Sequence, residues 1–140
     1  MFLTILLWII VFILSWFLQN CIHEGSHLYA AYWLRGWKPK EFHPYPGKRN
    51  GKWYFAYCSY ETDGKKTSEW IHIAPALAGW YWGCIWSVLC IFSYYVNMDG
   101  WVFCIVPMGM GFFDVFWFWR GYWWGSESCD GKRFRRASGL

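Results

Sequence analysis

Long apolar stretches alternate with polar segments along the chain. Residues 2–18 contain no charged side chain, and residues 101–119 contain only Asp114. A helix that crosses the hydrocarbon core of a bilayer needs about 20 mostly apolar residues. The pattern therefore predicts a single domain, residues 1–140, of an α-helical integral membrane protein. Its three transmembrane helices are expected at residues 2–34, 70–96 and 101–119.

The first apolar stretch is expected to be a retained helix rather than a cleaved signal peptide. It has no basic segment before it and no small-residue cleavage site after it. No helix-breaking pattern appears before Arg35 and Gly36, so the helix should continue through Gln19 and Asn20 to Leu34. A helix of that length spans about 50 Å, more than a hydrocarbon core of about 30 Å, and so must tilt or protrude.

Residues 37–69 are polar and aromatic, and they are expected to form a hairpin and loop between the first two membrane helices. The pair Asn50 and Gly51 favours a tight type I′ turn. Residues 52–61 after it predict a strand, both faces of which are largely apolar or aromatic. A hairpin that lies against the membrane surface would explain that lack of alternation.

The basic residues predict the orientation in the membrane. Of the 13 Lys and Arg, eight lie at residues 35–66 and five in the basic tail at residues 120–140, which is expected to be frayed after Gly125. The positive-inside rule places both segments, and so the hairpin and the C-terminus, in the cytoplasm, with the N-terminus outside. Anionic headgroups of the lipid bilayer account for the net charge of +4, so nucleic acid is not expected as a partner.

Small residues in the later spans indicate helix packing. Gly79 and Gly83 are four residues apart, a spacing that lets helices approach closely in lipid. Gly109 and Gly111 in the third span are expected to allow close packing against the first helix. The six cysteines form no C-x-x-C pair and are interpreted as packing residues, which disfavours zinc held by thiolates.

The sequence His23-Glu24-Gly25-Ser26-His27 has the pattern H-E-x-x-H. On a helix, residues four apart lie on one face, so both imidazoles can bind one Zn²⁺. Glu24 is the predicted catalytic base, which would take a proton from water acidified by the metal. Ionisable groups on a membrane helix are costly and therefore indicate function.

A catalytic zinc usually has three protein ligands, so the pattern requires one more. Asp114 is the predicted third ligand. Counted from the cytoplasmic boundary, it lies about 9 Å deep, against about 12 and 18 Å for His27 and His23. His72 and Asp130 are the alternative third ligands. They rank lower because His72 fits a membrane-interface histidine and Asp130 fits a turn residue in a solvated tail.

The motif at the end of an apolar segment, followed by Gly36 and a β-like stretch, resembles the site-2 protease family of intramembrane zinc metalloproteases. The resemblance implies that His23 and His27 bind zinc with a later membrane aspartate. It also implies that Glu24 is the base and that the hairpin helps to hold an extended substrate. The Leu-Asp-Gly context and the Asn-x-x-Pro element of that family are missing around Asp114, and Asp130-Gly131 copies the Asp-Gly dipeptide better.

Two functions follow as hypotheses. The first is a zinc-dependent metalloendopeptidase, within the membrane or at its surface, that hydrolyses peptide bonds of membrane-embedded or membrane-proximal protein substrates. The second is a non-catalytic membrane protein in which the same polar cluster is a structural metal site or a helix contact. A catalytic site should keep one coordination position open, whereas a structural site should be closed.

Overall fold

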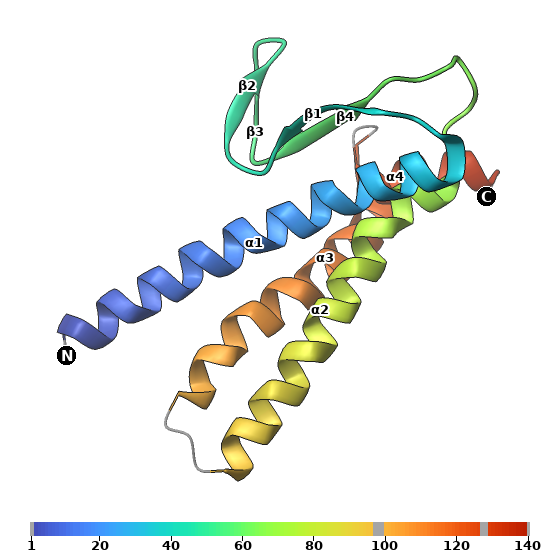
Figure 1. Cartoon of the computed structure of the whole chain (residues 1–140). Helices are drawn as coiled ribbons and strands as arrows, with labels where there is room; N and C mark the ends of the chain where they lie inside the picture. Colours follow the sequence, from blue (N-terminus) through green and yellow to red (C-terminus); the bar gives the residue numbers. More distant parts are fainter. Residues whose placement is uncertain (1, 97–99, 127–128, 140) are drawn as a thin grey trace.

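The structure is a computed structural model that describes the chain except residues 1, 97–99, 127–128 and 140, and it is mostly helical (Figure 1). The helices are α1 (Phe2–Arg35), α2 (Glu69–Tyr95), the 3-10 helix η1 (Trp101–Cys104), α3 (Ile105–Trp124) and α4 (Asp130–Ser138). The strands are β1 (Pro39–His43), β2 (Gly47–Arg49), β3 (Lys52–Tyr54) and β4 (Tyr57–Tyr60). Within these described residues, α1, α2 and Trp101–Trp124 are long and apolar enough to cross a membrane. This confirms the three predicted helices, and the third extends to Trp124, beyond its predicted end.

The long helices carry their apolar side chains outward and several polar side chains inward. Ile13 on α1, Val88 on α2 and Phe116 on α3 are all more than half exposed. The buried polar or charged residues are Ser15, Gln19, Glu24, His27, Ser68 and His72. Such an apolar exterior around a polar interior favours lipid over water as the surroundings of the helices.

Glycines hold α2 and α3 close together. A Cβ added to Gly111 would lie 2.6 Å from the carbonyl oxygen of Gly79, and one added to Gly83 would lie 2.9 Å from the ring of Phe112. The predicted close approach at Gly79 and Gly83 is therefore present. The expectation for the later glycines was wrong, because Gly111 faces α2 instead of α1 and a Cβ at Gly109 would meet no atom within 4 Å.

The predicted hairpin forms as two short antiparallel sheets. Asn50 and Gly51 both have positive φ, 50° and 77°, and they join β2 to β3 in the expected tight turn. The single strand expected at residues 52–61 is interrupted, because β3 pairs with β2 and β4 pairs with β1. The break lies opposite Pro44 and Pro46, which have no N–H with which to continue the ladder.

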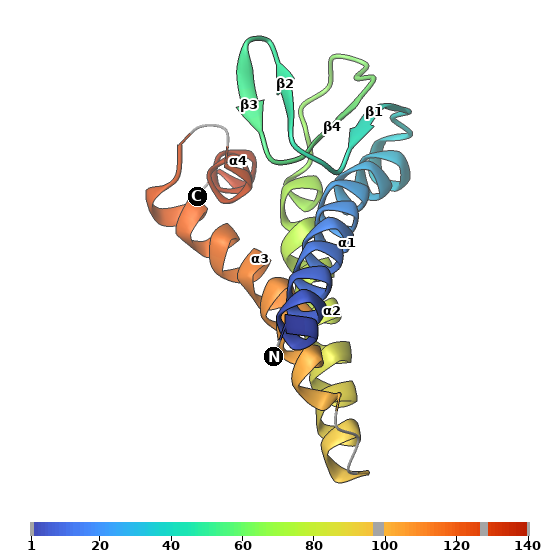
Figure 2. The ribbon, with the colours of Figure 1, turned by 90° about the vertical axis from the view of Figure 1, so that its left-hand side faces the viewer.

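A tryptophan fixes the hairpin to the helices. Trp37 follows Gly36, whose φ of +68° ends α1, and its side chain packs with Ala31 and Ile71 in the buried core. The indole Nε1 donates a hydrogen bond of 2.9 Å to Asp63, and the ring stacks on Tyr60. The hairpin strands therefore lie at the end of the long helices that is away from the N-terminus, and α4 lies at the same end (Figures 1 and 2).

The basic tail, expected to be frayed, contains the packed helix α4. Gly131 allows this contact, because a Cβ there would overlap the carbonyl oxygen of Phe118 and the backbone nitrogen of Tyr122. The ring of Phe134 contacts Phe118, with 5.6 Å between centroids. A small residue and an aromatic one thus attach the basic helix to α3, beside the first turns of α2 (Figure 2).

Candidate metal centre

Two histidines and one aspartate form the candidate metal centre. His23 and His27 lie one turn apart on α1, with ring centroids separated by 5.3 Å. Their Nε2 atoms lie 3.4 and 3.2 Å from Oδ2 of Asp130, the first residue of α4. The three ligand atoms all lie within 4.8 Å of one another. A tetrahedral zinc with bonds of about 2.0–2.1 Å places its ligand atoms about 3.3–3.4 Å apart.

The ring of His27 is held in its orientation by a backbone carbonyl, which bonds to Nδ1, the ring nitrogen that does not face Asp130. Its Nδ1–H donates a hydrogen bond of 2.7 Å to the carbonyl oxygen of Ile71 on α2. That carbonyl would normally accept the backbone N–H of residue 75, four positions later, but residue 75 is Pro75 and has none. The proline thus leaves an acceptor for the histidine, and the lone pair of neutral His27 lies on Nε2, toward Asp130.

The outer nitrogen of His23 faces Asp114. Nδ1 lies 3.2 Å from Oδ2 of Asp114, and the same oxygen accepts a hydrogen bond from Nε2 of Gln19. Asp114 therefore contacts His23 on the side opposite Asp130 and is outside the three-residue group. Asp114 was predicted as the third ligand. It does lie beside His23, but the geometry favours Asp130, one of the two alternatives, as the third ligand.

The Nε2 atoms of His23 and His27 and the carboxylate of Asp130 are stabilised by a positive charge between them. Neutral His27, whose Nδ1–H donates to the carbonyl of Ile71, presents a lone pair on Nε2 to the carboxylate of Asp130, and two acceptors repel. Neutral His23 does the same in the tautomer whose Nδ1–H donates to Asp114. Either a proton or a metal ion at that position removes the repulsion. The separations of 3.2 and 3.4 Å are longer than the roughly 2.7–2.9 Å of charge-assisted hydrogen bonds and match the tetrahedral spacing.

The electrostatics of Asp130 support an ionised carboxylate. Burial alone would raise the pKa of Asp130, but in the metal-free protein the charge of a protonated His27 and the polar contacts with the neighbouring histidines hold it well below its usual range. An ionised carboxylate is the form that binds a metal ion.

His72, the other alternative ligand, lies at the margin of the centre. Its Nδ1 is 3.8 Å from Oδ1 of Asp130 and has no hydrogen-bond partner among the described residues. His43, interpreted from sequence as a plain loop residue, lies on β1 against the rings of Tyr45 and Tyr57.

Glu24 is buried next to the metal group and beside the hairpin. Its carboxylate accepts a hydrogen bond from the thiol of Cys58 on β4. Burial, followed by the charge of Glu24, raises the pKa of Cys58, so this cysteine is a thiol donor that positions the carboxylate.

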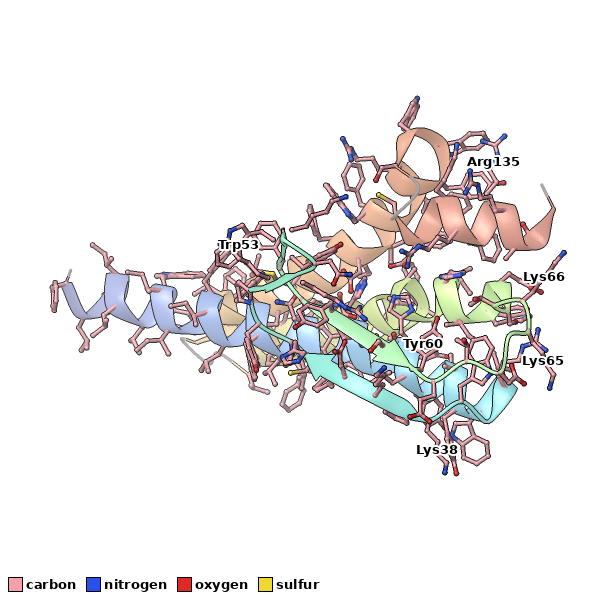
Figure 3. The ribbon with its side chains drawn as sticks, turned by 90° about the horizontal axis from the view of Figure 1, so that it is seen from above. Lys38, Trp53, Tyr60, Lys65, Lys66 and Arg135 are labelled. Atoms are coloured by element: carbon pink, nitrogen blue, oxygen red, sulfur yellow. The ribbon has the colours of Figure 1, made fainter. Side chains whose placement is uncertain are left out.

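Two adjoining cavities meet at these residues. A polar cavity of about 330 Å³ lies between α1, the strands and α4, with Ser59, Arg49 and Arg133 in its walls. An apolar cavity of about 660 Å³ lies among the long helices. The residues common to both are His23, Glu24, Ala56, His72 and Asp130. In Figure 3 the strands lie over α1, with Tyr60 at β4, and α4 with Arg135 lies to one side of them.

Several residues of the centre were missed by reasoning from sequence. Gln19 is four residues before His23, so its place on the same helix face was a usable signal. Pro75 and Cys58 gave no such signal, because their roles depend on which carbonyl and which carboxylate the fold places beside them.

Comparison of the chain with known proteins finds no matching protein-family model, no matching curated protein and no matching solved structure. The roles of the residues therefore depend on their geometry and chemistry.

Proposed function

We propose that the protein is an integral membrane zinc peptidase in which His23, His27 and Asp130 hold the metal and Glu24 is the general base. One observation carries the proposal. Both histidines direct Nε2 at the same carboxylate oxygen while their Nδ1 atoms have separate acceptors, Asp114 and the carbonyl of Ile71.

The donor set fits zinc. Two imidazole nitrogens and one carboxylate are a common set of protein ligands in hydrolytic zinc enzymes, and they leave one coordination position for water or substrate. The hydrogen bonds at Nδ1 orient both rings and make them better ligands, as outer partners do in many zinc sites. Asp114 therefore has a supporting role in the proposal.

The chemistry follows from the position of Glu24. Bound zinc would supply an acidified water and polarise the substrate carbonyl. The Glu24 carboxylate would accept the proton from that water and later return a proton to the amine that leaves. Its burial and the hydrogen bond from Cys58 keep it aimed at the centre, between the two cavities.

The arrangement of charge supports a membrane location for this site. Both basic segments, residues 35–66 and the tail with α4, lie at one end of the helices (Figures 1 and 2). By the positive-inside rule we assign that end to the cytoplasm and the N-terminus to the outside. His23 and His27 lie on the half of α1 nearer to that end, below the hairpin.

The position of the hairpin supports the proposal that the substrate is a peptide. The walls of the polar cavity include the run from Ala56 to Tyr60, so the main chain of β4 lies beside the metal residues. An extended peptide that adds along this strand would gain main-chain hydrogen bonds and present one peptide bond to Glu24. The resemblance to site-2 proteases leads to the same substrate class, membrane-embedded or membrane-proximal proteins.

Purified full-length protein tests the proposal. We expect about one zinc per chain and cleavage of a designed transmembrane peptide, with Glu24→Gln retaining zinc and losing roughly 10²–10⁴-fold in rate. Glu69→Gln, which changes an acidic residue at the start of α2 outside the centre, is the matched control and should cleave normally. Tight zinc without any hydrolysis would instead indicate a structural metal site, and absence of zinc binding would refute the metal assignment.

A further inference from the structure

The apolar cavity begins at the metal centre and extends among the long helices, away from the hairpin. Its volume, about 660 Å³, lies within the range of small-molecule binding sites, about 300–1,000 Å³. Aromatic and aliphatic side chains from two helices supply much of its wall, namely Phe12 and Trp16 of α1 with Met110, Phe113 and Trp117 of α3.

Polar groups in this wall include Gln19 and Asp114, which lie next to the metal residues. Gln19 and Asp114 are hydrogen bonded to each other, and Asp114 also contacts His23. Among the described lining residues, the acidic residues and the histidines are those of the metal centre, Glu24, His72 and Asp114, and the rest of the wall carries no charge. A charged ligand would lose its hydration without compensation, whereas an apolar one would gain by leaving water.

The cavity is continuous with the place where a substrate backbone would lie. Ala56, at the bend between β3 and β4, lines both cavities together with His23 and Glu24. A chain that lies along β4 therefore passes the opening of the apolar cavity at the point where its peptide bond reaches Glu24. Phe55, at the same bend, belongs to the rim of the apolar cavity.

We propose that this cavity is a specificity subsite that receives a large apolar side chain, aromatic or branched, from the substrate residue next to the hydrolysed bond. The inference rests on the proposed peptidase function and adds the substrate class: sequences with Phe or Leu beside the cleaved bond in preference to Ala or Asp.

A peptide series tests the preference. Designed transmembrane peptides differ only at the residue beside the cleaved bond, which is Ala, Leu, Phe or Asp. Since one methylene in an apolar pocket changes kcat/KM by about 10–200-fold, we expect the Phe peptide to exceed the Ala peptide at least about tenfold. Equal cleavage of the Phe and Asp peptides would overturn the proposal.

Met110 provides the matched pair of variants. Met110→Trp fills the cavity and should reduce the Phe-to-Ala ratio of kcat/KM at least about tenfold. Met108→Trp, on the same helix but outside the cavity wall, should leave the ratio unchanged. One zinc per chain shows that each variant is folded, and Ala76→Leu fills the same cavity from α2 if Met110→Trp fails to fold. An unchanged ratio in the filled cavity would refute the subsite.

A cross-linking experiment is independent of hydrolysis. The Glu24→Gln protein is irradiated with a peptide that carries benzoylphenylalanine at the varied position, and mass spectrometry locates the adduct. We expect the adduct on Met110 or Phe113. Adducts only on Met108 or other residues outside the cavity wall, no binding of the peptide, or a phospholipid acyl chain that fills the cavity would each overturn the subsite. Cross-linking at Met110 without cleavage by wild-type protein would refute the peptidase while supporting the subsite.

Discussion

Replacement of Pro75 by alanine tests how the fold orients a metal ligand. In the native chain the carbonyl oxygen of Ile71 accepts the Nδ1–H of His27 at 2.7 Å, because Pro75 offers no backbone N–H. Pro75→Ala introduces that N–H at the position where an α-helix directs it to the same carbonyl. The new donor competes with His27, which then loses the fixed ring orientation that aims Nε2 at Asp130.

The expected effects on stability and on metal binding have opposite signs. Loss of an outer partner of a metal-binding histidine typically lowers metal affinity about 10–100-fold, which corresponds to about 1.4–2.8 kcal/mol. Alanine is favoured over proline by about 3 kcal/mol in a helix interior, so α2 itself should become more stable. We therefore expect weaker zinc binding in a protein whose metal-free form unfolds no more easily than wild type.

Competition with a chelator in detergent gives the zinc affinity, and thermal unfolding of the metal-free protein gives its stability. Pro107→Ala is the matched control, because it makes the same substitution in α3 at a residue that lines neither cavity. A zinc affinity for Pro75→Ala within about twofold of wild type would refute this account of how His27 is oriented.

Three further predictions follow from contacts of the site and of the helices. Asp130→Ala should abolish stoichiometric zinc binding, whereas Asp114→Asn should weaken it only about 10–100-fold, as zinc titration would show; the reverse order would restore Asp114 as the ligand. Gly111→Val should separate α2 from α3 and lower the unfolding temperature, whereas Gly109→Val should not; equal temperatures would contradict the close packing. Gly131→Leu should displace α4 and reduce zinc binding through Asp130, measured by zinc titration; unchanged binding would show that α4 can attach without this glycine contact.

The sequence was most informative where one property repeats over many residues. Each long helix follows from about 20 or more apolar residues, and the tight turn at Asn50 and Gly51 follows from the rarity of positive φ in other residue types. The break between β3 and β4 was missed. It depends on Pro44 and Pro46, which lie opposite it between β1 and β2, and their effect appears only when the pairing register is known.

The third ligand was harder to predict, for a geometrical reason. Counting residues from the membrane boundary places Asp114 near the depth of the histidines, and the structure does put it beside His23. Depth cannot tell which ring nitrogen a carboxylate faces. Asp130 was ranked lower because it lies beyond the last apolar span, in a tail whose structure was not expected, and a helix of nine residues is indeed marginal without tertiary contacts. The contacts of Gly131 and Phe134 with α3 supply what local propensity lacks.

The polar face of α1 explains why so many elements converge at one place. Four polar side chains on that face have partners from other elements: Gln19 from α3, His23 from α3 and α4, Glu24 from β4, and His27 from α2 and α4. In lipid an unpaired polar group costs several kcal/mol, so these elements stabilise α1 only when they are assembled together. The same contacts that make the buried face tolerable also fix both imidazole rings and the carboxylate between them. Loss of any one element should therefore disturb the metal centre before it disturbs the apolar helices themselves.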